Sequence, residues 1–191
     1  MRNIYVTGVL VFIPFIILAQ ATDKFIDTRD GTEYKTIQIG TQVWMAENLN
    51  FSTPTSWCIE CETYGRLYNY NEAISACPDR WHLSSDLDWT ILVGYLGGFT
   101  NAGGKLKESG INHWKKPNKF ATNENGFNAI PHGYRSVNGI LNFENKMGFW
   151  WTSTENEKLN SWSIRIDYDK NNVTRQISNK DVGLSVRCVK D

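Results

Sequence analysis

The sequence predicts a single α+β domain, in which two short helices precede a region rich in antiparallel strands. Three observations support this prediction: apolar residues at helical spacing between residues 71 and 97, alternation of apolar and polar residues after residue 127, and four cysteines able to close the chain. No repeat or linker-like tract interrupts the chain, so we expect one continuous domain over residues 22–191.

The first 21 residues have the layout of a secretory signal peptide. Arg2 precedes an apolar run over residues 4–18, and the small residues Ala19 and Ala21 provide an A-x-A cleavage pattern. The run is shorter than the roughly 20 residues that a membrane-spanning helix needs. We therefore expect export to the cell envelope or the medium. The alternative is an uncleaved anchor, which would be the chain's one membrane contact.

In the first half, the pattern predicts two strands and two helices. Residues 33–45 alternate around a tight turn at Gly40, and residues 71–77 form a helix that Pro78 ends. Residues 81–83 are expected to be extended. The second helix begins after Ser85, a good N-cap, and ends at Gly97. Its expected apolar face contains Leu87, Ile91, Leu92, Tyr95 and Leu96.

In the second half, strands dominate. The chain after Gly104 is expected to be mostly loop until Phe127, where a strand over residues 127–134 begins. Asn138 and Gly139 predict a hairpin turn, because both accept a positive φ at low cost. The alternating segments 149–153, 161–168, 173–177 and 183–189 then predict an antiparallel meander.

Four cysteines remain after the apolar run, and an exported chain favours disulfides. Three pairings are possible, and we favour Cys58 with Cys61 and Cys77 with Cys188. The second pair would close a loop of about 110 residues and contribute on the order of 4–5 kcal/mol. The alternative for Cys58 and Cys61, a C-x-x-C pair, is a thiol–disulfide redox site, but no βαβ pattern surrounds it.

Composition excludes several classes of function. Twenty basic and twenty acidic residues give a net charge of zero, which argues against a nucleic-acid-binding protein. The three histidines lie far apart, so we expect no metal and no cofactor. No nucleophile, base or paired-carboxylate motif stands out, and we therefore expect that the protein is not an enzyme.

Candidate binding residues come from the strands and their ends. Neighbouring strand residues face opposite sides, so one of Trp150 and Trp151 is expected to be exposed. An exposed Trp150 could stack on a sugar or anchor a partner, together with Tyr134, Arg135 and His132. The alternative is that the outer ring is covered by the loop over residues 105–125.

Several blocks, in order, resemble the Fibrobacter succinogenes major paralogous domain, a family of exported bacterial domains. The resemblance covers nearly all of residues 27–191. The blocks are GTQVWMAENLN (40–50), YGRLY (64–68), ACPDRWHL (76–83), GFNA (126–129), GYR (133–135), FWWTSTE (149–155) and VGLSVRCVKD (182–191).

The resemblance implies a fold distantly similar to C-type lectins and to formylglycine-generating enzymes, in which a helix cysteine bonds to the last strand, as Cys77 and Cys188 would. The calcium-binding motifs of the lectins and the late cysteine pair of the enzymes do not occur here. We therefore expect a binding or display module for a glycan or a cell-envelope protein. The alternatives are a redox protein or enzyme using Cys58 and Cys61, and a structural component of a surface assembly.

Overall fold

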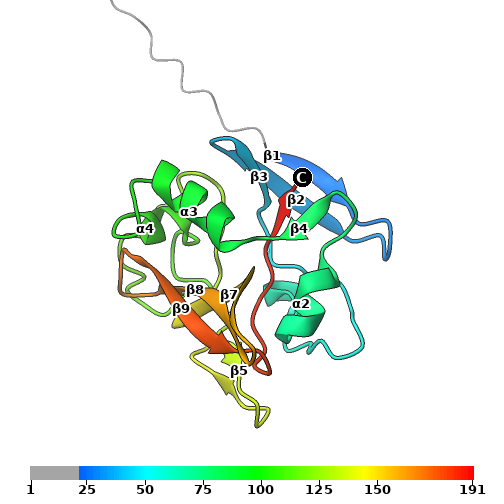
Figure 1. Cartoon of the computed structure of the whole chain (residues 1–191). Helices are drawn as coiled ribbons and strands as arrows, with labels where there is room; N and C mark the ends of the chain where they lie inside the picture. Colours follow the sequence, from blue (N-terminus) through cyan, green and yellow to red (C-terminus); the bar gives the residue numbers. More distant parts are fainter. Residues whose placement is uncertain (1–21) are drawn as a thin grey trace, which may run out of the picture.

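The computed structural model describes residues 22–191, which form four short helices and three antiparallel sheets (Figure 1). The α+β class and both favoured disulfides, Cys58–Cys61 and Cys77–Cys188, are confirmed. The expected signal peptide, residues 1–21, lies outside the described residues. Among the described residues, no helix combines the length and the apolar character that crossing a membrane requires.

The largest sheet has five strands in the order β1-β2-β3-β10-β4. β2 and β3 form the predicted hairpin around Gly40, whose φ of 60° is readily accessible to glycine. β1, which no pattern in the sequence predicts, pairs along the outer edge of β2. The strands are β1 (Thr22–Ile26), β2 (Glu33–Ile39), β3 (Gln42–Met45), β4 (Trp81–Leu83) and β10 (Cys188–Lys190).

The second half supplies a three-stranded meander and a small hairpin. β7 (Met147–Glu157), β8 (Asn160–Asp167) and β9 (Val173–Asn179) pair in sequence order, as predicted. β5 (Tyr134–Arg135) and β6 (Leu141–Asn142) flank the predicted Asn-Gly turn.

Two predicted strands differ from the structure. The segment 183–189 does not extend the meander. Its last residues form β10 between β3 and β4, where Cys188 pairs with Leu83 and is bonded to Cys77. The strand expected over residues 127–134 is also wrong: only Tyr134, in β5, belongs to a strand. Asn128 has a φ of 55° there, and this left-handed conformation interrupts an extended run.

The two predicted helices are present. α2 (Tyr70–Ala76) ends before Pro78, and α3 (Asp86–Tyr95) begins after Ser85. The Ser85 hydroxyl accepts the Asp88 amide and the Asp88 carboxylate accepts the Ser85 amide, which satisfies two otherwise unpaired donors of the helix end. Two one-turn helices were not expected from the sequence: α1 (Cys61–Tyr64) and α4 (Ala102–Leu106).

The buried face of α3 is rotated from the predicted one. Leu92 and Leu96 are buried as expected, but Leu87 and Tyr95 are 66% and 67% exposed. Trp89 sets this rotation, because its indole N–H donates to Ser84 Oγ at 2.9 Å and its ring packs among three other core aromatic rings. Val93 completes the buried face, and Ile91 is 43% exposed.

Two hydrophobic clusters form the core, and β7 lies between them. Trp150 belongs to the cluster that contains Trp89 and Trp114, whereas Trp151 belongs to the cluster that contains Tyr70. Both Trp150 and Trp151 are 0% exposed. The expectation that one of them faces solvent is therefore wrong, because this strand is covered on both faces.

The long loop after α4 is fixed by a buried lysine. Lys107 is 0% exposed, and its ammonium group donates to four backbone carbonyls at 2.7–3.3 Å. One carbonyl belongs to Lys119, one to Asp167 at the end of β8, and two to Tyr168 and Lys170 in the turn between β8 and β9. These bonds satisfy a buried charge that has no carboxylate bonded to it among the described residues.

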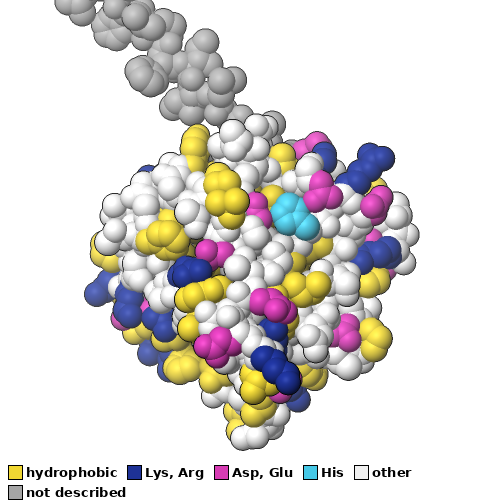
Figure 2. All heavy atoms as spheres, in the orientation of Figure 1, with side chains coloured by type: hydrophobic (Ala, Val, Ile, Leu, Met, Phe, Trp, Pro, Cys, Tyr) yellow, Lys and Arg dark blue, Asp and Glu magenta, His cyan; other side chains and the backbone are white. Residues whose placement is uncertain are grey.

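The face shown in Figure 2 has both basic and acidic side chains, separated by uncharged areas. No single-sign field covers that face, in agreement with the balanced composition.

Candidate functional site

The structure does not gather the four candidate binding residues at one exposed surface. Trp150 is fully buried, and its indole N–H donates to Asn48 Oδ1 at 2.8 Å. His132 is 2% exposed. A surface role for Trp150 is therefore excluded by its burial between the sheets, and its polar atom is already bonded within the core.

Tyr134 and Arg135 are half-buried on β5. The Tyr134 ring packs against Phe143 and Phe149, and the Arg135 guanidinium lies 4.1 Å from the centre of the Trp57 ring. Both side chains thus pack the β5–β6 hairpin against the domain.

A polar cleft lies elsewhere, between β2, the loop after β3, α1 and the loops near residues 113 and 128. Its volume is about 290 Å³. Its walls contain carboxylates, amides and one imidazole, and the described residues that line it include no lysine or arginine. The polar side chains used below are Glu33, Glu47, Glu62, Asn50, His113 and Asn128.

Asn48 builds the floor of this cleft. Its amide nitrogen donates to the Tyr64 carbonyl at 2.9 Å, which fixes the end of α1. Its amide oxygen accepts from Trp150 and from Arg187 at 2.8 and 2.9 Å. Gly65 follows α1 with a φ of 74°, and a Cβ placed there would lie 2.8 Å from Asn48 atoms. Only glycine fits this close approach.

Arg187 holds the floor from below. It is fully buried, and its guanidinium also donates to the Met45 and Phe127 carbonyls at 3.0 and 2.8 Å. Burial lowers the pKa of Arg187 to about 9, so the guanidinium remains charged at neutral pH. A charged donor paired with amide and carbonyl acceptors keeps the loop after β3 in one position.

Tyr34 and Asn50 form one wall of the cleft. The Tyr34 hydroxyl accepts the Asn50 backbone N–H at 3.0 Å, and burial raises the pKa of Tyr34 to about 12. The hydroxyl is therefore a neutral donor at physiological pH. Asn50 Oδ1 is buried and has no hydrogen-bond partner among the described residues.

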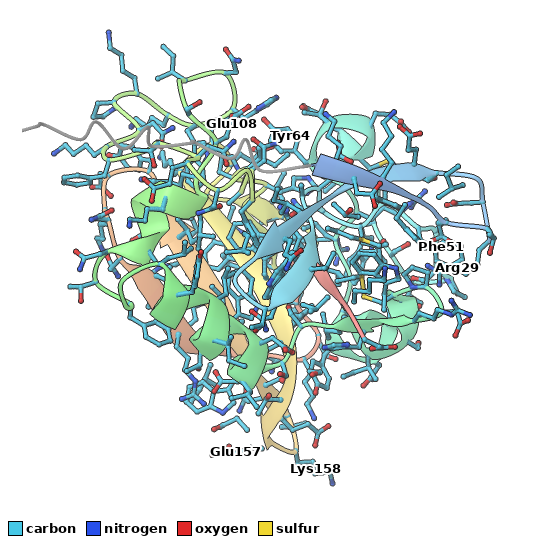
Figure 3. The ribbon with its side chains drawn as sticks, turned by 90° about the horizontal axis from the view of Figure 1, so that it is seen from above. Arg29, Phe51, Tyr64, Glu108, Glu157 and Lys158 are labelled. Atoms are coloured by element: carbon cyan, nitrogen blue, oxygen red, sulfur yellow. A yellow bond between two sulfur atoms is a disulfide. The ribbon has the colours of Figure 1, made fainter. Side chains whose placement is uncertain are left out.

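A row of rings borders the cleft at α1. The Tyr64 ring stacks on His132 with a centroid distance of 5.0 Å and meets the edge of His113 at 5.5 Å. His113 Nδ1 lies 2.9 Å from the Glu108 carboxylate, and Figure 3 shows Tyr64 and Glu108 on the same side of the molecule. The Tyr64 hydroxyl donates to Asn145 Oδ1, so the ring is fixed at both ends.

The His132 ring, on which Tyr64 stacks, is neutral. Its Nε2–H donates to the Ile59 carbonyl at 2.8 Å, and burial lowers the pKa of His132 to about 4. Because Ile59 lies inside the loop closed by Cys58 and Cys61, the disulfide and the imidazole together position α1.

The Fibrobacter succinogenes major domain, a family model, matches residues 37–190. The chain belongs to this family. Comparisons with curated proteins and with solved structures find no match.

The range matched by the Fibrobacter succinogenes major domain includes most of the cleft. Asn48, Glu62, His113 and Asn128 lie inside it, whereas Tyr34 precedes it. Asn48 belongs to one of the blocks that carry the family resemblance, but nothing in its local pattern marks it as the floor of a cleft. The cleft residues cannot be recognised from the sequence, because they come from separate segments with no shared spacing.

The side chains of the cleft in this Fibrobacter succinogenes major domain are suited to hydrogen bonding. Carboxylates and amide oxygens accept, while the Tyr34 and Thr63 hydroxyls and the Asn128 amide can donate. Among residues 22–191, no group of three or more His, Cys, Asp or Glu side chains has an arrangement suited to a metal ion. Cys61 borders the cleft as half of a disulfide, so it presents no thiol there.

Proposed function

We propose that this domain is a non-enzymatic, exported binding module that holds a hydroxyl-rich ligand, such as one unit of a glycan, in the polar cleft. The acceptor-rich wall carries the proposal. Glu62 offers a carboxylate that has no ion pair among residues 22–191. The Glu33 and Glu47 carboxylates add acceptors but also pair with Lys24 and Lys35 at 2.7 and 3.7 Å. Sugar hydroxyls are hydrogen-bond donors, so they match these acceptors.

The size and walls of the cleft support a small ligand. A volume of about 290 Å³ is close to the lower end of ligand pockets, about 300 Å³, so it suits a single ring rather than an extended chain. The His113 ring in its wall offers apolar surface beside the polar side chains, and the Tyr64 ring packs against it.

Two disulfides support export, because such bonds persist in oxidising compartments. We further propose that the fold is C-type-lectin-like. Cys77, directly after α2, is bonded to Cys188 in the last strand, which is the connection that the family resemblance implies. The coarse α+β architecture is compatible with this assignment.

A glycan array with matched variants tests the proposed function. Tyr34→Phe removes a hydroxyl that lines the cleft, and Glu62→Gln replaces an exposed carboxylate there. We expect the wild-type domain to bind a defined set of glycans and each variant to weaken that binding by about tenfold. Glu157→Gln, at the far hairpin in Figure 3, is the control and should bind normally.

If the folded wild-type domain binds no glycan, or if Glu157→Gln weakens binding as much as Glu62→Gln, the cleft is not a glycan site. Folding of each variant is checked by near-ultraviolet circular dichroism, which reports on the packed tryptophans.

One observation favours a second candidate, a thiol–disulfide exchange protein. Cys58 is exposed whereas Cys61 is buried, so an external dithiol protein could attack Cys58 Sγ and release Cys61 as the thiolate. Titration of native protein with a thiol reagent after mild reduction distinguishes the candidates. Rapid, reversible opening of this pair alone would favour exchange, and resistance of the pair would leave it structural.

A further inference from the structure

The meander ends in a strand whose outer edge is unpaired. β9 follows β8 in the sheet order β7-β8-β9, and it is the outer, orange strand of that sheet in Figure 1. Its backbone groups must point alternately toward β8 and away from it. Which residues face outward can be worked out from two hydrogen bonds at its ends.

The Lys180 amide donates to the Leu159 carbonyl, which continues the register of β8 with β9. Residues 174, 176 and 178 therefore bond to β8. At the other end, the Val173 amide donates away from β8, to the Phe99 carbonyl. By the same alternation, the amides and carbonyls of Arg175 and Ile177 and the amide of Asn179 point to an edge with which no element of the described residues pairs. The Asn179 carbonyl accepts the Val182 amide at 3.2 Å.

This edge lacks the usual protection against strand pairing. β9 has seven residues without proline, glycine, lysine or a carboxylate. Its one charged side chain, Arg175, is drawn over the face of Trp162, 3.3 Å from the ring centre, and is bonded to Asp86. By contrast, the free edge strand β1 has Asp23 and Lys24 exposed within five residues.

From this geometry we propose that β9 is a homotypic docking edge, at which a second copy of this chain pairs antiparallel to form one continuous six-stranded sheet. This interaction surface is independent of the proposed glycan cleft. A two-fold axis at Ile177 places each outward-facing residue opposite another outward-facing residue. The two Ile177 residues exchange both backbone hydrogen bonds, and the Asn179 amide donates to the carbonyl of Arg175 of the partner subunit. The Arg175 amide shares the carbonyl of Asn179 of the partner subunit with the Val182 amide that already donates to it.

The side chains favour this register. Ile177 is 51% exposed, and it would meet Ile177 of the partner subunit on the axis, which buries apolar surface on both copies. Arg175 would face Asn179 of the partner subunit, a cation opposite a neutral side chain whose amide oxygen already accepts the Asp181 amide at 2.9 Å. No like charges are placed opposite each other along the strand. Trp162 lies beside Ile177 across the β8–β9 ladder and extends the apolar contact.

Amide hydrogen exchange of the full folded domain, measured by NMR at low and high protein concentration, tests the pairing residue by residue. We expect the amides of Arg175, Ile177 and Asn179 to exchange more slowly as concentration rises, by about tenfold or more. The intervening Thr174 and Gln176 amides bond to β8 and should be protected at every concentration. Analytical ultracentrifugation measures dimer formation in the same samples.

Two variants with one matched control complete the test. Ile177→Lys would place two ammonium groups on the axis, and Ile177→Pro removes an amide that points only to the free edge. Each variant should weaken dimerisation by about tenfold or more. Thermal unfolding should stay cooperative in both. Ile26→Lys alters an equally exposed isoleucine on β1 and should leave the dimer unchanged. A domain that stays monomeric, or a dimer insensitive to Ile177→Lys, would overturn the proposal.

Discussion

Acidification is expected to destabilise this domain through His132. The ring is 2% exposed, its Nε2–H is used by the Ile59 carbonyl, and its Nδ1 is buried without a partner among the described residues. A proton added at Nδ1 would be a buried charge without an acceptor. Burial accordingly lowers the pKa of His132 from 6.5 to about 4 in the folded chain.

The sign and size of the effect follow from this difference in pKa. The unfolded chain binds the proton near pH 6.5, so below that pH it holds more protons than the folded chain does. The stability contributed by the neutral ring is complete above pH 6.5 and is lost as the pH falls to about 4. Conversion of the pKa difference gives a loss of about 3 kcal/mol in the free energy of unfolding.

Urea unfolding of wild type and His132→Gln across this pH window measures the effect. Glutamine can donate an amide N–H to the Ile59 carbonyl but does not titrate, so the variant removes the pH dependence due to this ring alone. The other titratable groups bind protons equally in both proteins, so their contributions cancel in the comparison. The difference in free energy of unfolding between wild type and His132→Gln should therefore change by about 3 kcal/mol between neutral pH and pH 4.

Direct NMR titration of the imidazole is the second readout. Glu60 and Glu144 line the small cavity next to His132, and their negative charges favour the protonated ring. A measured His132 pKa at or above 6.5, or parallel pH profiles of wild type and His132→Gln, would refute the argument that burial dominates.

Three further predictions concern the framework of the cleft. Arg187→Met leaves several buried acceptors without a donor, and we expect urea unfolding to show a loss of about 3–5 kcal/mol. Cys77→Ser together with Cys188→Ser removes a disulfide whose cysteines are 111 residues apart in sequence. Urea unfolding without reductant should show that the free energy of unfolding falls by about 4–5 kcal/mol. Gly65→Ala, at a φ of 74° and with atoms 2.8 Å from the added Cβ, should cost about 1–3 kcal/mol. Gly94→Ala, which meets nothing within 4 Å, is its control and should be nearly neutral or stabilising.

Local chemistry made much of the fold predictable. Ser85 caps α3 because a hydroxyl at that position satisfies a free amide, and this depends only on residues three apart. The turns at Gly40 and Gly139 follow from the low cost of positive φ in glycine. The disulfide between Cys77 and Cys188 followed from counting cysteines and from the family resemblance.

The tertiary structure alone decided the rest. Alternation along β7 predicts one buried and one exposed tryptophan, but Trp150 and Trp151 are both buried because separate clusters cover the two faces of the strand. The sequence by itself determined the α+β class, the helices α2 and α3, the β2–β3 hairpin, the meander β7-β8-β9 and the family. It did not determine the cleft, because Asn48, Glu62 and Asn128 come from distant loops that meet only when the buried guanidinium and the disulfides fix them.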